Sequence, residues 1–209
     1  CQEVVHTSGI DLRKMLPAPT NTEFDAAPYF GMGLLCAQDP ETGVGDVTIH
    51  RMGIQGPDKI TIWFTPGRHI DAFRAKAEKQ GKPLPVSVNM GLDPAIYLSA
   101  CFEPPTTPLG FNELSIAGAL RGRPVEMVDC VSVRAKALAR AEIVLEGELL
   151  PDVRMAEDIN SKSSYAMPEF PGYMGEAKEA LPVMKVTAIT HRKDPVLQTT
   201  MGTGLEHCN

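Results

Sequence analysis

The sequence predicts an α+β fold with a largely antiparallel sheet or barrel. Three observations lead to this prediction: about eight short segments have the apolar or alternating pattern of strands, only about three have helical periodicity, and turn-forming residues separate them. The sequence has no internal repeat, no low-complexity segment and no stretch with the composition of a linker. We therefore expect one folded unit in which strands dominate.

The first strands are predicted near the N-terminus. Residues 29–37 are apolar and end at the turn-forming segment 39–43. Residues 47–53 and 59–65 alternate between polar and apolar side chains, and a Gly-Pro-Asp turn separates them. Two adjacent strands joined by so short a turn predict a β-hairpin.

The first helix is predicted over residues 70–80. Its periodicity places Ile70, Phe73 and Ala77 on one face, which we expect to be buried. Gly81 follows directly and is the residue type that most often ends a helix.

Two further helices are predicted in the middle of the chain. Asp93 is suited to an N-cap and Pro94 to the first helical position, so we expect a helix from there to about residue 102. Residues 112–121 have helical periodicity with small side chains for close packing, and Gly122 ends this helix.

The remaining segments are expected to be strands or loops. Residues 152–165 are polar and unpatterned, which predicts a flexible loop. The further strand-like segments are 84–90, 125–133, 141–150, 181–190 and 195–200.

The composition limits the classes of function. The 209 residues carry 20 Lys and Arg against 26 Asp and Glu, and the net charge of -6 argues against nucleic-acid binding as the main function. Hydrophobic residues at 43% and charged residues at 22% exclude wholesale disorder. No apolar run approaches the roughly 20 residues needed to span a bilayer, so no membrane span is expected.

Cysteine usage predicts a reducing, cytoplasmic compartment. The cysteines are odd in number and widely spaced, and no CxxC pair occurs, so a zinc knuckle or redox dithiol is not expected. No signal-peptide pattern follows Cys1, and we expect the chain to be a piece of a longer protein. The five cysteines are Cys1, Cys36, Cys101, Cys130 and Cys208.

Three side chains are candidate metal ligands. Asp46 precedes a predicted strand, His69 opens a predicted helix, and Glu113 lies at the start of another. Carboxylates with an imidazole suit a divalent cation such as manganese or magnesium. The alternative is that they are ordinary turn and helix-start residues, because helix N-termini favour acidic side chains.

Arg51 and Glu169 are candidate catalytic residues. Arg51 lies within a predicted strand, where it is either solvated or holds a carboxylate through its guanidinium fork. Glu169 lies between Pro168 and Pro171 beside apolar side chains. Partial desolvation there raises the pKa of a carboxyl group and suits a proton donor, whereas the alternative is an exposed Glu in a rigid turn.

Several common catalytic motifs are absent from the sequence. No GxGxxG follows a predicted strand and no GxxxxGK[ST] occurs, so neither a dinucleotide fold nor a P-loop is supported. The GxSxG motif of serine hydrolases is also absent.

Five groups of residues occur together in an order typical of one enzyme family. They are 84–88 (LPVSV) with 91–95 (GLDPA), Glu113 with 116–122 (IAGALRG), 141–147 (AEIVLEG), 169–173 (EFPGY) and 190–195 (THRKDP). On these residues the chain resembles the UbiD-like decarboxylases, which use prenylated FMN to remove CO2 from aromatic and unsaturated acids. Residues 167–173 (MPEFPGY) look most like the branch of the family that acts on phenolic acids such as 4-hydroxybenzoate, protocatechuate, vanillate and gallate.

The resemblance implies a role for each candidate residue. Asp46, His69 and Glu113 match the positions that hold Mn2+, with K+ beside it, against the cofactor phosphate. Arg51 matches the arginine that holds the substrate carboxylate, and Glu169 matches the carboxyl group that protonates the product. Segments that line the cofactor correspond to Ile49, His50, Arg51, Trp63, Phe64, Thr65, Arg68 and His69.

Two positions depart from the family pattern. Asp46 stands where Asn is common, which adds a negative charge to the metal site. A second catalytic carboxylate is usual five residues before the proton donor, where this chain has Ser164. Glu157 lies further upstream, and the sequence alone leaves open whether it takes that role.

The resemblance also implies a fold and an organisation. The expected fold is a split β-barrel like that of flavin reductases, and residues 1–209 are expected to be the central cofactor-binding domain of a larger decarboxylase whose flanking domains are missing from this chain. The full-length protein is expected to be a homo-oligomer, to receive its cofactor from a flavin prenyltransferase and to act on a small aromatic carboxylic acid. The alternatives are a non-catalytic FMN-binding barrel or scaffold subunit and, from the Asp, His and Glu alone, a metal-dependent hydrolase.

Overall fold

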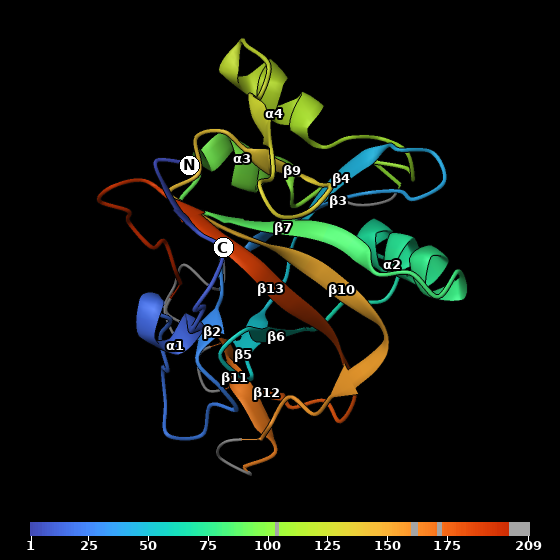
Figure 1. The fold of residues 1–209 in the computed structure, drawn as a ribbon. Coiled ribbons are helices and arrows are strands. Elements are labelled where there is room, and N and C mark those ends of the chain that lie inside the picture. The colour runs from blue at the N-terminus through green and yellow to red at the C-terminus, as the bar shows by residue number, and fades with distance from the viewer. Residues whose placement is uncertain (103–104, 160–162, 171–172, 201–209) are drawn as a thin grey trace.

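The computed structural model describes residues 1–102, 105–159, 163–170 and 173–200, without the side chains of residues 169 and 170. In this part of the chain a nine-stranded sheet forms the body of the molecule (Figure 1). All of its strand pairs are antiparallel, and two separate two-stranded sheets flank it.

The order of the strands in the main sheet is β2-β5-β6-β13-β10-β7-β3-β4, and β1 pairs with β13. The strands are β1 (Val4–His6), β2 (Tyr29–Phe30), β3 (Leu34–Gln38), β4 (Gly45–Ile49), β5 (Met52–Ile54), β6 (Lys59–Ile62), β7 (Leu84–Met90), β8 (Met127–Asp129), β9 (Lys136–Leu138), β10 (Ile143–Met155), β11 (Tyr165–Phe170), β12 (Tyr173–Glu176) and β13 (Leu181–His191). The helices are α1 (Leu12–Met15), α2 (His69–Lys79), α3 (Pro94–Ser99) and α4 (Leu114–Arg121).

The two long strands β10 and β13 run side by side through the centre of the sheet and bend together (Figure 1). A bulge interrupts their register between Glu146 and Gly147. A Cβ atom at Gly147 would lie 2.1 Å from the carbonyl oxygen of Lys185, so only glycine fits this close approach. The bulge therefore depends on that glycine.

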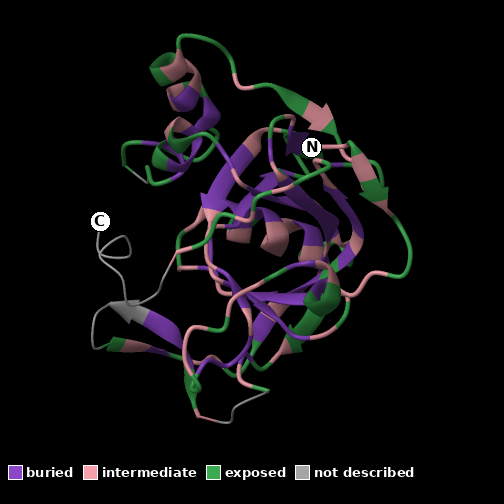
Figure 2. Cartoon of the chain, turned by 90° about the vertical axis from the view of Figure 1, so that its left-hand side faces the viewer, coloured by how far each residue is buried: buried purple, intermediate pink, exposed green. Residues whose placement is uncertain are grey.

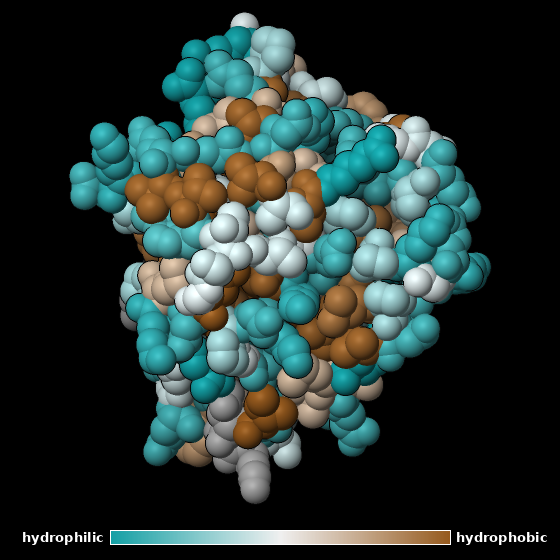
Figure 3. Space-filling view, in the orientation of Figure 1, coloured by the Kyte–Doolittle hydropathy of each residue, from teal (hydrophilic) through white to brown (hydrophobic). Residues whose placement is uncertain are grey.

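The main hydrophobic core lies between the curled sheet and α2. The predicted helix face is buried as expected, because Ile70, Phe73 and Ala77 all belong to this core together with Val86 and Val88 of β7. Buried residues are concentrated in the strands and exposed ones in the connections (Figure 2). On the face shown in Figure 3, apolar side chains form scattered patches among polar ones.

A smaller core lies under α3 and α4. Asp93 caps α3 as predicted, since its carboxylate accepts a hydrogen bond of 2.9 Å from the backbone N–H of Ala95. Gly122 ends α4 in the left-handed conformation, with a φ of 67°. Among the helices of the described segments, none is long and apolar enough to cross a membrane.

The expected split β-barrel is wrong. The sheet has two ends, β2 and β4, and within the described residues no hydrogen-bonded ladder joins them. A closed barrel requires a hydrogen-bonded ladder between every two neighbouring strands, and in the described segments the one between β2 and β4 is missing. The chain passes from β4 to β5, the strand that pairs with β2, through His50 and Arg51, which belong to neither strand.

Several predicted boundaries also change. The strand predicted at 47–53 is divided at His50 and Arg51, and the one at 29–37 is divided into β2 and β3. Of the segment 125–133 only β8 is extended, and 195–200 forms no strand. The hairpin is present as β5 and β6, with Met52 opposite Ile62.

Candidate active site

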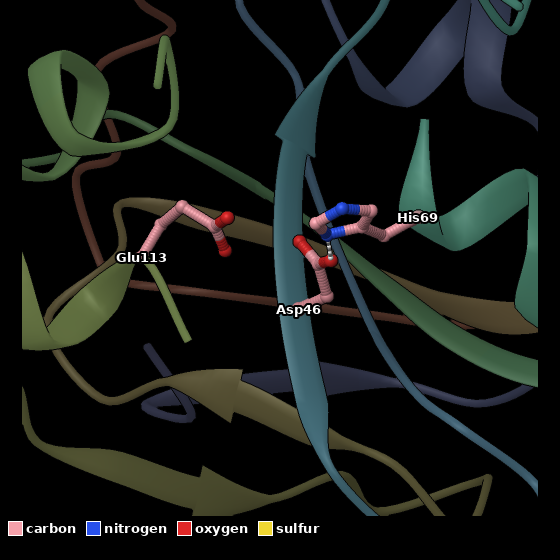
Figure 4. A group of neighbouring side chains, drawn as sticks. All are labelled: Asp46, His69 and Glu113. Atoms are coloured by element: carbon pink, nitrogen blue, oxygen red, sulfur yellow. Dashed lines mark hydrogen bonds and ion pairs between the residues drawn. The ribbon is translucent and has the colours of Figure 1, made fainter. Parts of the chain in front are cut away.

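Asp46, His69 and Glu113 converge from three separate elements (Figure 4). Asp46 lies in β4, His69 is the first residue of α2, and Glu113 immediately precedes α4. One potential ligand atom from each residue lies within 4.8 Å of the other two, and His69 Nδ1 lies 2.6 Å from Asp46 Oδ2. The three residues are exposed by only 5%, 9% and 2%.

Two polar atoms of this group of residues, the Asp46–His69–Glu113 cluster, have no hydrogen-bond partner in the described part of the chain. His69 Nε2 and Glu113 Oε2 are buried, and neither has a partner among the described residues. Burial raises the pKa of Asp46 and of Glu113, and the negative charge of Asp46 raises that of Glu113 further. Two buried carboxyl groups with an imidazole fit a divalent cation, which would supply the missing partner and neutralise the charge.

Arg68 lies beside this cluster, and its charge also acts on His50. Arg68 lines the same small pocket as Asp46 and Glu113, and its positive charge lowers the pKa of Asp46 against the effect of burial. His50 is buried with its ring edge against Phe64, at a centroid distance of 4.7 Å. Burial and the charge of Arg68 lower the pKa of His50 to about 3, so its imidazole is neutral.

Arg51 is not a solvated strand residue. Its side chain is only 9% exposed and forms a bidentate ion pair with Glu157, with Nε to Oε1 at 2.8 Å and a terminal nitrogen to Oε2 at 2.9 Å. Its guanidinium also lies over the ring of Trp63 at 4.7 Å and donates a hydrogen bond of 3.0 Å to the carbonyl of Glu176. The alternative of an outward-facing arginine therefore does not apply.

Glu157 is the functional candidate that the sequence left undecided. It is 1% exposed, and besides Arg51 it accepts hydrogen bonds from the Tyr29 hydroxyl at 3.1 Å and from the backbone N–H of Lys178 at 3.0 Å. Ser164, where the resemblance implies a second carboxylate, is exposed and has a φ of 65°. Glu157 is a buried carboxylate next to Arg51, and a catalytic role for it stays a prediction.

The other residues predicted to line the cofactor lie at the ends of β4 and β6. Ile49 ends β4, and Trp63, Phe64 and Thr65 follow β6 directly. Glu169 lies in β11, but its side chain is outside the described residues, so its role stays a prediction.

The hairpin of β11 and β12 connects to Arg51 through its backbone. Tyr165 of β11 is opposite Glu176 of β12, and the carbonyl of Glu176 is the one that accepts a hydrogen bond from Arg51. The strand that carries Glu169 is therefore anchored close to the ion pair of Arg51 and Glu157.

An open antiparallel sheet with these two buried polar clusters matches a known class of protein, and the chain belongs to the UbiD family. The family model described as the 3-octaprenyl-4-hydroxybenzoate carboxy-lyase Rift-related domain matches residues 1–204. The family resemblance of the sequence is thus confirmed.

Individual relatives narrow the comparison. A gallate decarboxylase from Lactiplantibacillus plantarum is 52% identical over 95% of this chain and 41% of its own length. The apo 3,4-dihydroxybenzoic acid decarboxylase AroY from Klebsiella pneumoniae superposes with a TM-score of 0.91 at 58% identity, over 97% of this chain and 42% of that one. An evolved dimeric form of the UbiD-class enzyme HmfF from Pelotomaculum thermopropionicum, in complex with prFMN, gives a TM-score of 0.88 at 41% identity, over 99% of this chain and 45% of that one. The chain spans less than half the length of these relatives.

Proposed function

We propose that this chain is the cofactor-binding part of a non-oxidative decarboxylase that acts on a phenolic carboxylic acid with prenylated FMN and Mn2+. The observation that carries the proposal is the buried Asp46–His69–Glu113 cluster, whose orphaned polar atoms fit a divalent cation. The similarity to gallate and 3,4-dihydroxybenzoic acid decarboxylases supports the phenolic substrate, and the HmfF complex supports the cofactor.

The cluster and the start of α2 would hold the metal and the cofactor phosphate. Mn2+ would take Asp46, His69 and Glu113 as ligands, and K+ remains an expectation of the family resemblance. Arg68 directly precedes α2, so its charge and the free N–H groups of the first helical turn favour a phosphate there. The cofactor ring would lie along residues 49–51 and 63–65.

Prenylated FMN, when bound, supplies a ring that accepts the electron pair released as CO2 leaves. Arg51 would orient the substrate carboxylate through its positive charge and its guanidinium donors. Glu157 accepts hydrogen bonds from Nε and from one terminal nitrogen of that guanidinium and so holds it in place. Glu169 would deliver the proton that replaces the carboxylate on the aromatic ring of the substrate.

The test uses the full-length protein that contains this chain, produced together with a flavin prenyltransferase. We expect bound flavin absorbance and CO2 release from gallate or 3,4-dihydroxybenzoate. Glu169→Gln should retain the flavin and lose activity by about 10²–10⁴-fold, the range typical of a positioned acid. A protein that binds flavin but releases no CO2 from any phenolic acid would instead be the non-catalytic scaffold.

A further inference from the structure

The hydroxyl group of Tyr29 is buried against Glu157. The side chain lies in β2 and is 1% exposed, and its hydroxyl donates a hydrogen bond of 3.1 Å to Glu157 Oε1. Burial and the negative charge of Glu157 raise the pKa of this phenol far above its usual value. Tyr29 therefore keeps its proton and is a permanent donor.

The hydroxyl of Tyr29 is one of four hydrogen-bond donors to the Glu157 carboxylate. Oε1 accepts from Tyr29 and from Arg51 Nε, and Oε2 accepts from Arg51 and from the N–H of Lys178. Two carboxylate oxygens offer about four acceptor positions, so all are in use. A carboxylate held by four donors has one orientation, and the guanidinium paired with it has one as well.

Glu157 depends on such partners because it lies outside any strand. It follows the end of β10 at Met155 and precedes β11. Its backbone carbonyl accepts a hydrogen bond of 2.7 Å from Gln55 Nε2, and the same nitrogen lies 3.1 Å from Thr61 Oγ1. Tyr29 of β2 thus holds the side chain of Glu157, and Gln55, directly after β5, holds its backbone.

Gly53 leaves the space in which these groups meet. A Cβ atom there would lie 3.1 Å from Thr61 Oγ1, 3.2 Å from the Tyr29 ring and 3.3 Å from Gln55 Nε2. These distances are shorter than ordinary van der Waals contacts. Because Gly53 has no Cβ atom, the side chains of Tyr29, Gln55 and Thr61 can pack directly over it.

We propose that Tyr29 and Gln55 are positioning residues that fix Glu157 and, through it, the guanidinium of Arg51. This inference rests on the proposed function in one respect, namely that Arg51 orients the substrate carboxylate. Tyr29 acts through Glu157 rather than on the substrate or the cofactor. Its hydrogen bond restricts the rotation of the Glu157 carboxylate in the ion pair. The stacking of Arg51 over Trp63 restricts the guanidinium in the same way.

The first test compares Tyr29→Phe with Tyr97→Phe in the full-length enzyme loaded with cofactor. Tyr97 is a matched control, because it is also buried and donates one hydrogen bond of 3.1 Å, to the carbonyl of Met32. We expect Tyr29→Phe to lower kcat per bound flavin by roughly ten- to a hundred-fold, because a misplaced catalytic group loses rate on this scale. KM should change little, since the charge of Arg51 remains, and Tyr97→Phe should leave both constants unchanged.

The second test does not use turnover. The N–H of Lys178 donates to Glu157 Oε2, so hydrogen exchange of a peptide covering Lys178, followed by mass spectrometry, reports on how firmly Glu157 is held. Exchange should be faster in Tyr29→Phe and unchanged in Tyr97→Phe. Gln55→Met should accelerate it too, which provides a second variant if Tyr29→Phe folds poorly.

The outcomes separate this inference from the proposed function. If the wild-type enzyme releases no CO2, the proposed function fails. The exchange measurement still tests whether Tyr29 and Gln55 hold Glu157 in place. If Tyr29→Phe lowers the midpoint of thermal unfolding but leaves kcat per flavin and the exchange near Lys178 unchanged, Tyr29 only fills space. That result would overturn the inference.

Discussion

Two buried polar clusters, the Asp46–His69–Glu113 cluster and the group around Glu157, differ in how completely the protein satisfies their polar atoms. In the Asp46–His69–Glu113 cluster, buried atoms of His69 and Glu113 lack partners among the described residues, and the pKa values of both carboxyl groups are raised. Around Glu157, four donors occupy the carboxylate. Folding leaves the first cluster incomplete and completes the second.

The difference indicates what each cluster does. A buried group without a partner costs free energy that a bound ion can recover, so the first cluster is suited to receive something from outside. A fully bonded network instead fixes geometry before any ligand arrives. Each cluster has a residue near the end of β4, since Asp46 lies in this strand and Arg51 follows its last residue by two positions.

The largest expected effect comes from breaking the completed cluster. Glu157→Ala leaves the guanidinium of Arg51 buried without its carboxylate, so the free energy of unfolding should fall by about 3–5 kcal/mol. Urea unfolding at neutral pH measures this.

Glu126→Ala is the control for that prediction, because it removes a carboxylate from an ion pair with Arg140 whose two side chains are 45% and 64% exposed. Its cost should be at most about 1 kcal/mol. Equal losses in the two variants would show that the pair of Arg51 and Glu157 is no better satisfied than a surface pair.

The sequence predicted much of the incomplete cluster and little of the completed one. Asp46, His69 and Glu113 lie at helix and strand starts and match a family motif, so their convergence could be expected. Glu157 is 106 residues from Arg51 and falls in a segment whose polar, unpatterned sequence predicts only a loop. Tyr29 has the apolar pattern of a strand, which does not reveal that its hydroxyl meets Glu157.

For the fold as well, features set by the local sequence pattern could be predicted, and features set by contacts between distant segments could not. Strand β7 and the buried face of α2 follow from periodicity alone, and the structure agrees with both. The hairpin of β11 and β12 was not predicted, because Pro168 interrupts its pattern. Whether a sheet closes depends on hydrogen bonds between strands distant in sequence, and the barrel prediction failed at that point.

The second prediction fills the incomplete cluster. Mn2+ at about a hundred times its Kd should raise the free energy of unfolding of the wild type by about 2.7 kcal/mol, because it binds only the folded state. Glu113→Gln should bind little Mn2+ and gain little stability from it. Without metal the same variant should be at least as stable as the wild type, since one of two crowded carboxyl groups is gone. Elemental analysis and thermal unfolding with and without Mn2+ measure both effects, and equal Mn2+ content in the two proteins would contradict the assignment.

The smallest predicted effect concerns His50, which lies in the segment between β4 and β5. Burial and the charge of Arg68 lower its pKa to about 3 in the folded protein, whereas an imidazole in an unfolded chain titrates near 6.5. Between these values the unfolded chain binds a proton that the folded protein does not, so stability falls as the pH decreases below about 6.5. At pH 5 the loss should be about 2 kcal/mol.

His50→Gln removes this proton from both states, so the variant should lose about 2 kcal/mol less than the wild type between pH 7.5 and pH 5. Urea unfolding at the two pH values measures the difference, and each protein is its own reference at pH 7.5, where the imidazole is neutral in both states. The other titrating groups contribute equally to both proteins and cancel. If the two proteins lose the same stability, His50 binds a proton in the folded protein as readily as in the unfolded chain. That result would contradict a pKa lowered by burial and by the charge of Arg68.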